Sequence, residues 1–312
     1  MDQSVQDRIR GRVKAGVLGL PRARRFILIL SLSLLALRAA AQTGLKVYIS
    51  TDMEGVDGVS TSVQSSSSGR EYQEFRRLLT EEANAAVAGA FDAGATEVLV
   101  SDSHADGQNI DLDLFDKRAR LIRGWPRPLG MMGGIDNTFA AAAFVGFHAS
   151  EGTAGATLPH TFNGTMTLAL DGTAVGEIGF DAAIAGEFGV PVVFLSGDQM
   201  AGEEAKTLLG GIETAEVKHS LGYHAAIMLP PEQARELIRV GMKRGVERRA
   251  GIKPYRIAHP VRLAITFQQL LDAEILSYLP GVERPRPDTV VFTAPDMIEA
   301  SKFMEVALHR VD

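Results

Sequence analysis

Beyond residue 44, short apolar runs alternate along the chain with longer segments in which apolar side chains recur at helical spacing. Residues 72–91 and 180–188 predict helices on this basis, and Gly94 follows the first of them as a stop signal. The apolar runs that predict buried strands are 45–50, 97–100, 141–147 and 191–195. This order of strands and helices predicts an α/β fold with a largely parallel sheet flanked by helices.

The pattern changes toward the C-terminus. Asp171-Gly172 separates residues 167–170 from residues 173–176, as the turn of a β-hairpin does. After residue 214 the sequence predicts a long amphipathic helix, a strand and a second helix, over residues 231–249, 261–267 and 294–308. We therefore expect a larger α/β domain over residues 43–214 and a smaller α+β region over residues 215–312.

The first 42 residues have a different character. Basic residues between Arg8 and Arg25 precede an apolar run over 26–37, and Ala39-Ala40-Ala41 follows that run. This order is typical of a secretory signal peptide over residues 1–42, and the run is shorter than the about 20 residues of a membrane span. We expect a periplasmic or secreted protein with no stable membrane insertion after cleavage. The alternatives are an uncleaved anchor, or a misassigned start codon and a cytoplasmic protein.

Composition narrows the possible chemistry. Hydrophobic residues make up 46% of the chain, which is enough for a sizeable core. The formal net charge is -6, and no basic stripe follows residue 42, so nothing favours binding to nucleic acid. The absence of cysteine excludes disulfides, thiolate metal sites and a cysteine nucleophile. Any metal ion must therefore be held by His, Asp and Glu.

Two carboxylates follow the first predicted strand. Residues two apart on an extended chain point to the same side, so Asp52 and Glu54 can face one crevice. That crevice would lie at the carboxyl edge of the sheet, where open α/β proteins bind their ligands. A solvated acidic turn or a helix cap is the alternative interpretation of this segment.

Two of the chain's 7 histidines follow the next two predicted strands. His104 comes directly after the strand 97–100, and His148 ends the strand 141–147. Each could ligate a metal ion, with Asp102 either orienting the His104 ring or serving only as a turn residue. Alternatively, His104 is a surface or capping residue beside a turn, and His148 is a hydrogen-bonded core residue.

Further candidates lie in loops and in an apolar stretch. His160 follows a Gly-rich loop and could act as a general acid or base, or be an ordinary loop residue. Glu177 stands between two glycines among apolar residues, where burial is costly unless the acid is paired or bound to metal. A surface hairpin is its alternative. Asp198 either supports the site or caps the helix that starts near Ala201.

Five segments, taken in order and spacing, resemble the zinc-dependent D-aminopeptidases of the DppA type. They are Asp52-Met53-Glu54-Gly55, Ser101-Asp102-Ser103-His104, Gly146-Phe147-His148, Pro159-His160 and Val175-Gly176-Glu177. The resemblance runs from about Lys46 to the end of the chain. It implies two zinc ions held by Asp52, Glu54, His104, His148 and Glu177, with His160 as the catalytic histidine. It also implies a ring-shaped homodecamer that cleaves an N-terminal D-amino acid, such as D-Ala, from short peptides.

The sequence therefore predicts a two-metal zinc aminopeptidase, in which we expect Asp52 to bridge both ions. One alternative is a two-metal hydrolase of another small amide or ester. Another is a periplasmic protein that binds a metal or a peptide without turnover. The placement of His160 separates catalysis from binding alone, because a ring that pointed away from the metals would favour binding. No His-Glu-x-x-His helix, GxSxG elbow or nucleotide-binding glycine motif is present.

The predicted signal peptide has a direct test. N-terminal sequencing of the mature protein from its native cell should begin near Gln42, because Ala39-Ala40-Ala41 supplies the small residues of a cleavage site. A mature soluble protein that still begins at Met1 would contradict cleavage.

Overall fold

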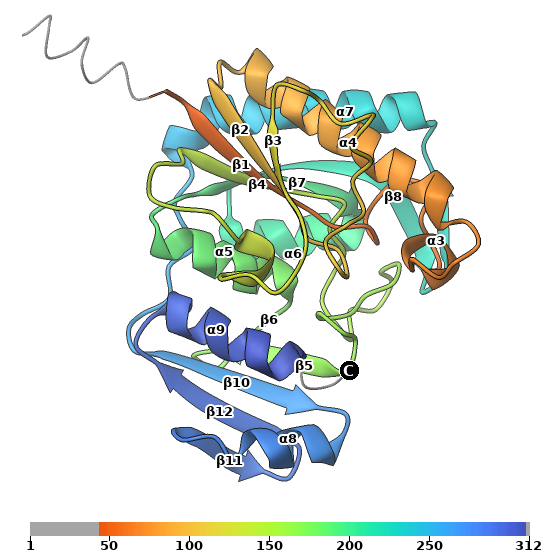
Figure 1. The fold of residues 1–312 in the computed structure, drawn as a ribbon. Coiled ribbons are helices and arrows are strands. Elements are labelled where there is room, and N and C mark those ends of the chain that lie inside the picture. The colour runs from red at the N-terminus through yellow and green to blue at the C-terminus, as the bar shows by residue number, and fades with distance from the viewer. Residues whose placement is uncertain (1–43, 310–312) are drawn as a thin grey trace, which may run out of the picture. The chain divides into compact units, whose positions relative to one another are not determined.

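The predicted parallel strands form the centre of a seven-stranded sheet (Figure 1). All neighbouring pairs of this sheet are parallel except the last, where β9 runs antiparallel to β8. In spatial order the strands are β3 (Arg120–Ile122), β2 (Glu97–Asp102), β1 (Lys46–Thr51), β4 (Ala141–Val145), β7 (Val192–Asp198), β8 (Glu213–Gly222) and β9 (Ala225–Met228).

The order of these strands places a topological switch point between β1 and β4. The chain first adds β2 and β3 on one side of β1, and then returns to place β4 on the other side. At such a switch point the connecting segments leave in opposite directions, which opens a ligand-binding crevice at the carboxyl ends of the strands. The predicted α/β fold with a largely parallel sheet is confirmed.

Helices cover both faces of the large sheet (Figure 1). On one face α4 (Tyr72–Asp92) packs against α7 (Pro231–Arg248), which a short 3₁₀ turn, η2 (Arg249–Gly251), extends. Their apolar stripes meet the alternate side chains of β1, β2 and β4 in one hydrophobic cluster. On the other face lie α5 (Glu177–Glu187) and α6 (Gln199–Leu209).

A second, antiparallel sheet lies beyond α5, with α9 (Met297–Leu308) beside it (Figure 1). Its order is β11 (Val282–Arg286), β12 (Thr289–Ala294), β10 (Val261–Phe267), β5 (Met166–Leu170) and β6 (Thr173–Val175), and α8 (Leu270–Leu276) follows β10. The predicted hairpin around Asp171-Gly172 is confirmed as the β5–β6 pair.

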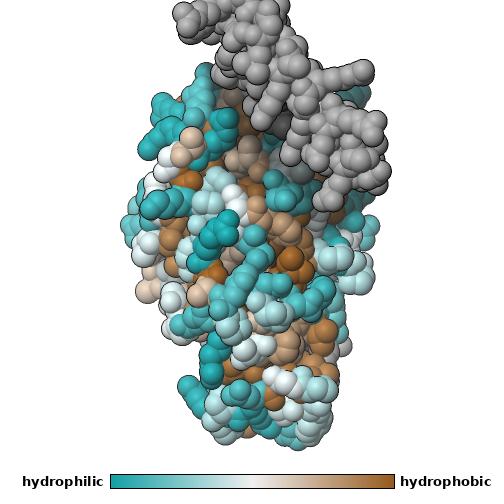
Figure 2. Space-filling model, turned by 90° about the vertical axis from the view of Figure 1, so that its left-hand side faces the viewer, coloured by the Kyte–Doolittle hydropathy of each residue, from teal (hydrophilic) through white to brown (hydrophobic). Residues whose placement is uncertain are grey.

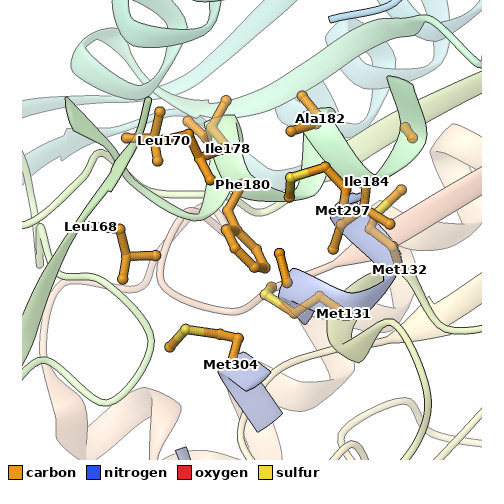
Figure 3. Packing of buried hydrophobic residues seen from close by; sticks show 14 of the residues in the cluster. Met131, Met132, Leu168, Leu170, Ile178, Phe180, Ala182, Ile184, Met297 and Met304 are labelled. Atoms are coloured by element: carbon orange, nitrogen blue, oxygen red, sulfur yellow. The ribbon is translucent and has the colours of Figure 1, made fainter. Parts of the chain in front are cut away.

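One apolar cluster joins the two sheets through α5. Figure 3 shows Phe180 of α5 among Met131, Leu168 and Met304, which come from the short turn η1 (Gly130–Met132), from β5 and from α9. Residues 178–186 of α5 are buried throughout, so this helix has no solvent-facing polar stripe in that stretch. Because α5 is packed on all sides, the residue at its first turn is held in a fixed position.

The sheets do not follow the expected division of the chain at residue 214. β8 and β9, from the C-terminal region, extend the large sheet, while β5 and β6 join the small one. Residues 45–309 form one compact unit by their contacts. The boundary between residues 43–214 and 215–312 stays a prediction.

The structure, a computed structural model, describes residues 44–309, so the predicted signal peptide over residues 1–42 lies outside the described residues. Within residues 44–309, no helix combines the length and the apolar character needed to cross a membrane. On the side of the molecule in Figure 2, apolar and polar residues are interspersed over the coloured surface.

Two helix caps of this fold provide a stability test. Asp198 accepts a hydrogen bond from the Ala201 amide at the start of α6 (2.9 Å) and a second from the Thr157 amide (2.8 Å). Asp296 accepts one cap bond, from the Glu299 amide of α9. Asp198→Ala should lower the free energy of unfolding by about 2–4 kcal/mol, because it also leaves a buried amide unpaired. Asp296→Ala should lower it by about 1 kcal/mol.

Urea denaturation of both variants at one protein concentration measures this difference. Equal losses for the two variants would show that the contact with Thr157 contributes nothing.

Candidate metal centre

All six candidate residues named from the sequence meet at the carboxyl edge of the large sheet. Asp52 and Glu54 follow β1, His104 follows β2, and His148 follows β4, so they surround the crevice at the switch point. The remaining two complete the group, with His160 in the loop after His148 and Glu177 as the first residue of α5. Asp52, Glu54, His148 and Glu177 are all buried.

Asp52 lies at the centre of the group. Its Oδ1 is 3.2 Å from Nδ1 of His104, and its Oδ2 is 3.1 Å from Nε2 of His148. The two oxygens of one carboxylate therefore face two different sets of side chains. This geometry is the one that a carboxylate bridging two ions requires.

The other two carboxylates lie on opposite sides of Asp52. Glu54 Oε2 is 3.1 Å from Nδ1 of His104, whereas Glu177 Oε1 is 3.4 Å from Nε2 of His148 and 4.0 Å from Nε2 of His160. The ligand-type atoms form overlapping triads within 4.8 Å of one another: Asp52, Glu54 and His104; Asp52, His148 and Glu177; and Glu54, His148 and His160.

Backbone carbonyls orient all three imidazole rings. His104 Nε2 bonds to the carbonyl of Ser65, His148 Nδ1 to that of Ala149, and His160 Nδ1 to that of Leu158, each at 2.9 Å. A carbonyl only accepts, so the outer nitrogen of each ring must carry a proton. The other nitrogen of each ring then faces the carboxylates.

The inner nitrogens need a cation or a second proton. In a neutral ring each of them presents a lone pair to carboxylate oxygens, which are acceptors as well. Accordingly, Asp52 Oδ2, Glu54 Oε2 and His148 Nε2 are buried without a well-formed hydrogen bond among residues 44–309. Outer-nitrogen bonds to carbonyls are typical of metal-ligating histidines, and two imidazoles with three carboxylates suit zinc.

The electrostatics of the group agree with this interpretation. Burial alone would raise the pKa of Asp52, but hydrogen bonds and positive charge from His104 and His148 hold that pKa well below its ordinary value. Burial and the repulsion from Asp52 would raise the pKa of Glu54, but the charge and hydrogen bond of His104, together with the charge of His160, lower that pKa to about 2. Burial would lower the pKa of His148, yet Glu177 and Asp52 raise it well above the ordinary value. The carboxylates thus attract positive charge to the centre of the site.

Two glycines allow the site-bearing segments to meet. A Cβ on Gly55 would lie 2.0 Å from the carbonyl oxygen of Phe147, so only glycine lets the Glu54 loop approach the end of β4. A Cβ on Gly176, the extended residue before α5, would lie 2.5 Å from the Cβ of Ser150. Larger residues at these two positions would separate Glu54 and Glu177 from His148.

The structure decides several local alternatives. Glu177 is a buried helix residue, and its Oε1 accepts the Phe162 amide at 2.5 Å, so it is no surface hairpin acid. The predicted start of that helix at residue 180 was three residues late, because glycines on both sides of Glu177 obscure the helical pattern. Asp198 caps α6, as one alternative stated.

The suggestion that Asp102 orients the His104 ring was wrong. Its carboxylate accepts the amides of Asn109 and Ile110 and the side-chain amide of Asn109, at 2.6–2.8 Å. It therefore anchors the loop that follows His104, whereas the ring itself is held by the carbonyl of Ser65, the last residue of α3 (Ser62–Ser65).

Sequence reasoning missed two further features of the site. The rings of His148 and His160 stack, with centroids 3.8 Å apart and planes inclined by 14°. Lys218, on β8, is buried beneath the Glu54 loop. No motif marks either feature, since both depend on segments that are distant in sequence.

The chain is similar to known D-aminopeptidases. A D-aminopeptidase of Bacillus subtilis (strain 168) is 35% identical to the chain over 263 residues, which cover 84% of this chain and 96% of the relative. The solved structure of the Zn-dependent D-aminopeptidase DppA from Bacillus subtilis, described as a self-compartmentalizing protease, matches with a TM-score of 0.83. That match has 34% sequence identity and covers 85% of this chain and 97% of the solved chain.

The family model for the D-aminopeptidases, Peptidase_M55, matches residues 45–306, which is nearly the whole described chain. The relatives are peptidases, and the resemblance drawn from the five sequence segments is confirmed. The protein is therefore a peptidase that belongs to the D-aminopeptidase family.

Proposed function

We propose that this protein is a zinc-dependent aminopeptidase that releases the N-terminal residue, a D-amino acid such as D-Ala, from short peptides. The observation that carries the proposal is the placement of Asp52, whose two oxygens face His104 on one side and His148 on the other. The preference for a D-amino acid is supported by the relatives named as D-aminopeptidases, because stereochemical preference depends on the shape of the substrate pocket.

The proposed ligands divide into two sets that share Asp52. One zinc ion would be held by Asp52, Glu54 and His104, and the other by Asp52, His148 and Glu177. Three carboxylates offset much of the charge of two Zn²⁺ ions. Bound zinc would supply Lewis acidity to the scissile peptide carbonyl.

His160 would carry the proton transfers. Its Nδ1–H donates to the Leu158 carbonyl, so its free Nε2 is directed at the carboxylates rather than away from them. Its stacking on His148 fixes the plane of the ring. A ring held in this way can accept a proton from the attacking water and return it to the leaving amine. This orientation favours turnover over binding alone.

We also propose that the chain assembles into a closed homo-oligomer, a decamer by family resemblance. The relative described as self-compartmentalizing supports this proposal. Large apolar side chains on two surface elements, β8–β9 and the region of α8, would be covered by such assembly: Leu221, Tyr223, Ile227, Leu270, Leu271 and Tyr278. Export to the periplasm or the medium remains part of the proposal and rests on residues 1–42.

Hydrolysis of D-Ala-D-Ala tests the proposed function. The zinc-loaded protein should release D-Ala, exhaustive chelation should abolish the release, and added zinc should restore it. L-Ala-L-Ala and an N-acetylated D-Ala-D-Ala serve as controls for stereochemistry and for the free amino terminus. Activity that survives in metal-free protein would reject the zinc site, and equal cleavage of the acetylated peptide would indicate a different small amide hydrolase.

Because His160 and Asp52 have different roles, we expect their alanine variants to differ in metal content and rate. His160→Ala should retain both zinc ions and the oligomer, while kcat falls by about 10²–10⁴-fold, because proton transfer is lost. Asp52→Ala should lose zinc, since the carboxylate that faces both sets of ligands is removed. Metal content by mass spectrometry, particle mass and steady-state kinetics measure the three properties.

His219→Ala is the matched control for the histidine variant. His219 pairs with Glu216 on the surface of β8, so its removal should leave metal content and rate unchanged. An empty site or an unchanged rate in His160→Ala would refute the role given to His160.

A further inference from the structure

A buried lysine holds the loop that carries Glu54. Lys218 is 1% exposed, and its Nζ donates hydrogen bonds to three backbone carbonyls, those of Glu54, Val56 (3.0 Å) and Val59 (2.6 Å). An ammonium group has three N–H donors, and here each of them has one acceptor. The lysine therefore gathers a stretch of six residues around a single point.

The loop needs such a partner. Residues 53–60 lie between β1 and α3 and form neither strand nor helix, so their carbonyls lack the partners that a ladder would supply. The loop is buried in large part, and buried carbonyls must be paired. Within the loop, the amides of Val56 and Val59 donate to the carbonyls of Met53 and Val56, which leaves the carbonyls of Glu54 and Val59 to Lys218.

A change of register in the sheet directs Lys218 inward. Gly197 of β7 pairs with Glu216 of β8, but the next residue, Asp198, pairs with Lys218, so one residue of β8 is skipped. As a result, Val217 and Lys218 are both buried, although regular alternation would expose one of them. Irregularities of this kind commonly turn a side chain toward a functional site.

Acidic groups from three other elements surround the lysine. Asp198, Glu82, Glu54 and Asp57 all act on its charge. Glu82 of α4 also accepts the Asp57 amide at 2.8 Å, so the loop is held from the helix side as well. This environment accommodates a buried cation that would otherwise be costly.

We propose that Lys218 is a positioning residue that fixes Glu54 for the metal ion held with Asp52 and His104. The inference rests on the proposed metal site. Lys218 acts on the backbone of residue 54, so its loss should release one metal ion in preference to the other. The second set, with His148 and Glu177, is carried by the segment after β4 and by α5, to which Lys218 makes no hydrogen bond.

The test measures the two zinc affinities and the visible spectrum of the cobalt-loaded protein for Lys218→Met, Lys218→Arg and the wild type. Lys218→Met should lower the affinity for one of the two zinc ions by about 10–100-fold and alter the cobalt spectrum. Metal sites lose affinity on that scale when a supporting partner is removed. Lys218→Arg should show a smaller loss of affinity for the same ion. A planar guanidinium keeps the positive charge but cannot donate three hydrogen bonds from one nitrogen. If Lys218→Met does not fold, the zinc affinities of Lys218→Arg test the proposal.

Val217→Ala is the control, because Val217 neighbours Lys218 in β8 and packs in the core on the side of α7. It should lower stability and leave both zinc affinities and the cobalt spectrum unchanged. Wild-type zinc affinities in either lysine variant, or an equal loss in Val217→Ala, would overturn the proposal. Failure of the wild type to bind zinc would instead refute the proposed function.

Discussion

Three buried carboxylates within a few ångströms of one another are the constraint around which this molecule is organised. Asp52, Glu54 and Glu177 cannot all remain ionised in a buried crevice without nearby positive charge. The inner nitrogens of His104 and His148 face them, and either protons or metal ions can supply that charge. Since metal ligation requires deprotonated imidazoles, binding of metal releases protons and depends on pH.

The rest of the fold brings these groups together and holds them there. The pairing of β1 with β4 brings together the segments that carry Asp52 and His148, while the all-round packing of α5 fixes Glu177. Backbone groups complete the arrangement. Carbonyls fix each histidine ring, and the close approach at Gly55 joins the two loops that flank the crevice. Lys218, from the distant strand β8, adds a buried cation to these contacts.

The sequence predicted the elements whose side chains are apolar throughout or strictly periodic. Strands β1, β2, β4 and β7 and the long helices α4 and α7 fall in this class, because burial on both faces, or on one stripe, leaves a clear pattern. The strands β3, β8, β9, β11 and β12 were not predicted. β3, β9 and β11 are short, and β8 carries alternating polar residues, whereas β12 is a mostly buried apolar run that the prediction missed. The allocation of strands to two sheets also could not be read locally, because it depends on pairings between residues far apart, such as Leu168 with Ile265.

The site followed a similar rule. Ligand-type residues at the ends of predictable strands were found from their positions, and the structure places all of them in one crevice. The sequence could not reveal the contacts that support the candidate ligands. These are the hydrogen bond from His104 to the Ser65 carbonyl, the contacts of Asp102 and the inward orientation of Lys218. These arise from register and loop closure, which leave no periodic signal along the chain.

Anomalous X-ray diffraction at the zinc absorption edge, from crystals of the zinc-loaded protein, tests the central claim most directly. The account predicts two peaks per subunit with Asp52 between them, each about 2.0–2.2 Å from its carboxylate and imidazole ligands. One peak should lie against Glu54 and His104, and the other against His148 and Glu177. A single peak, or two peaks of which only one touches Asp52, would contradict it.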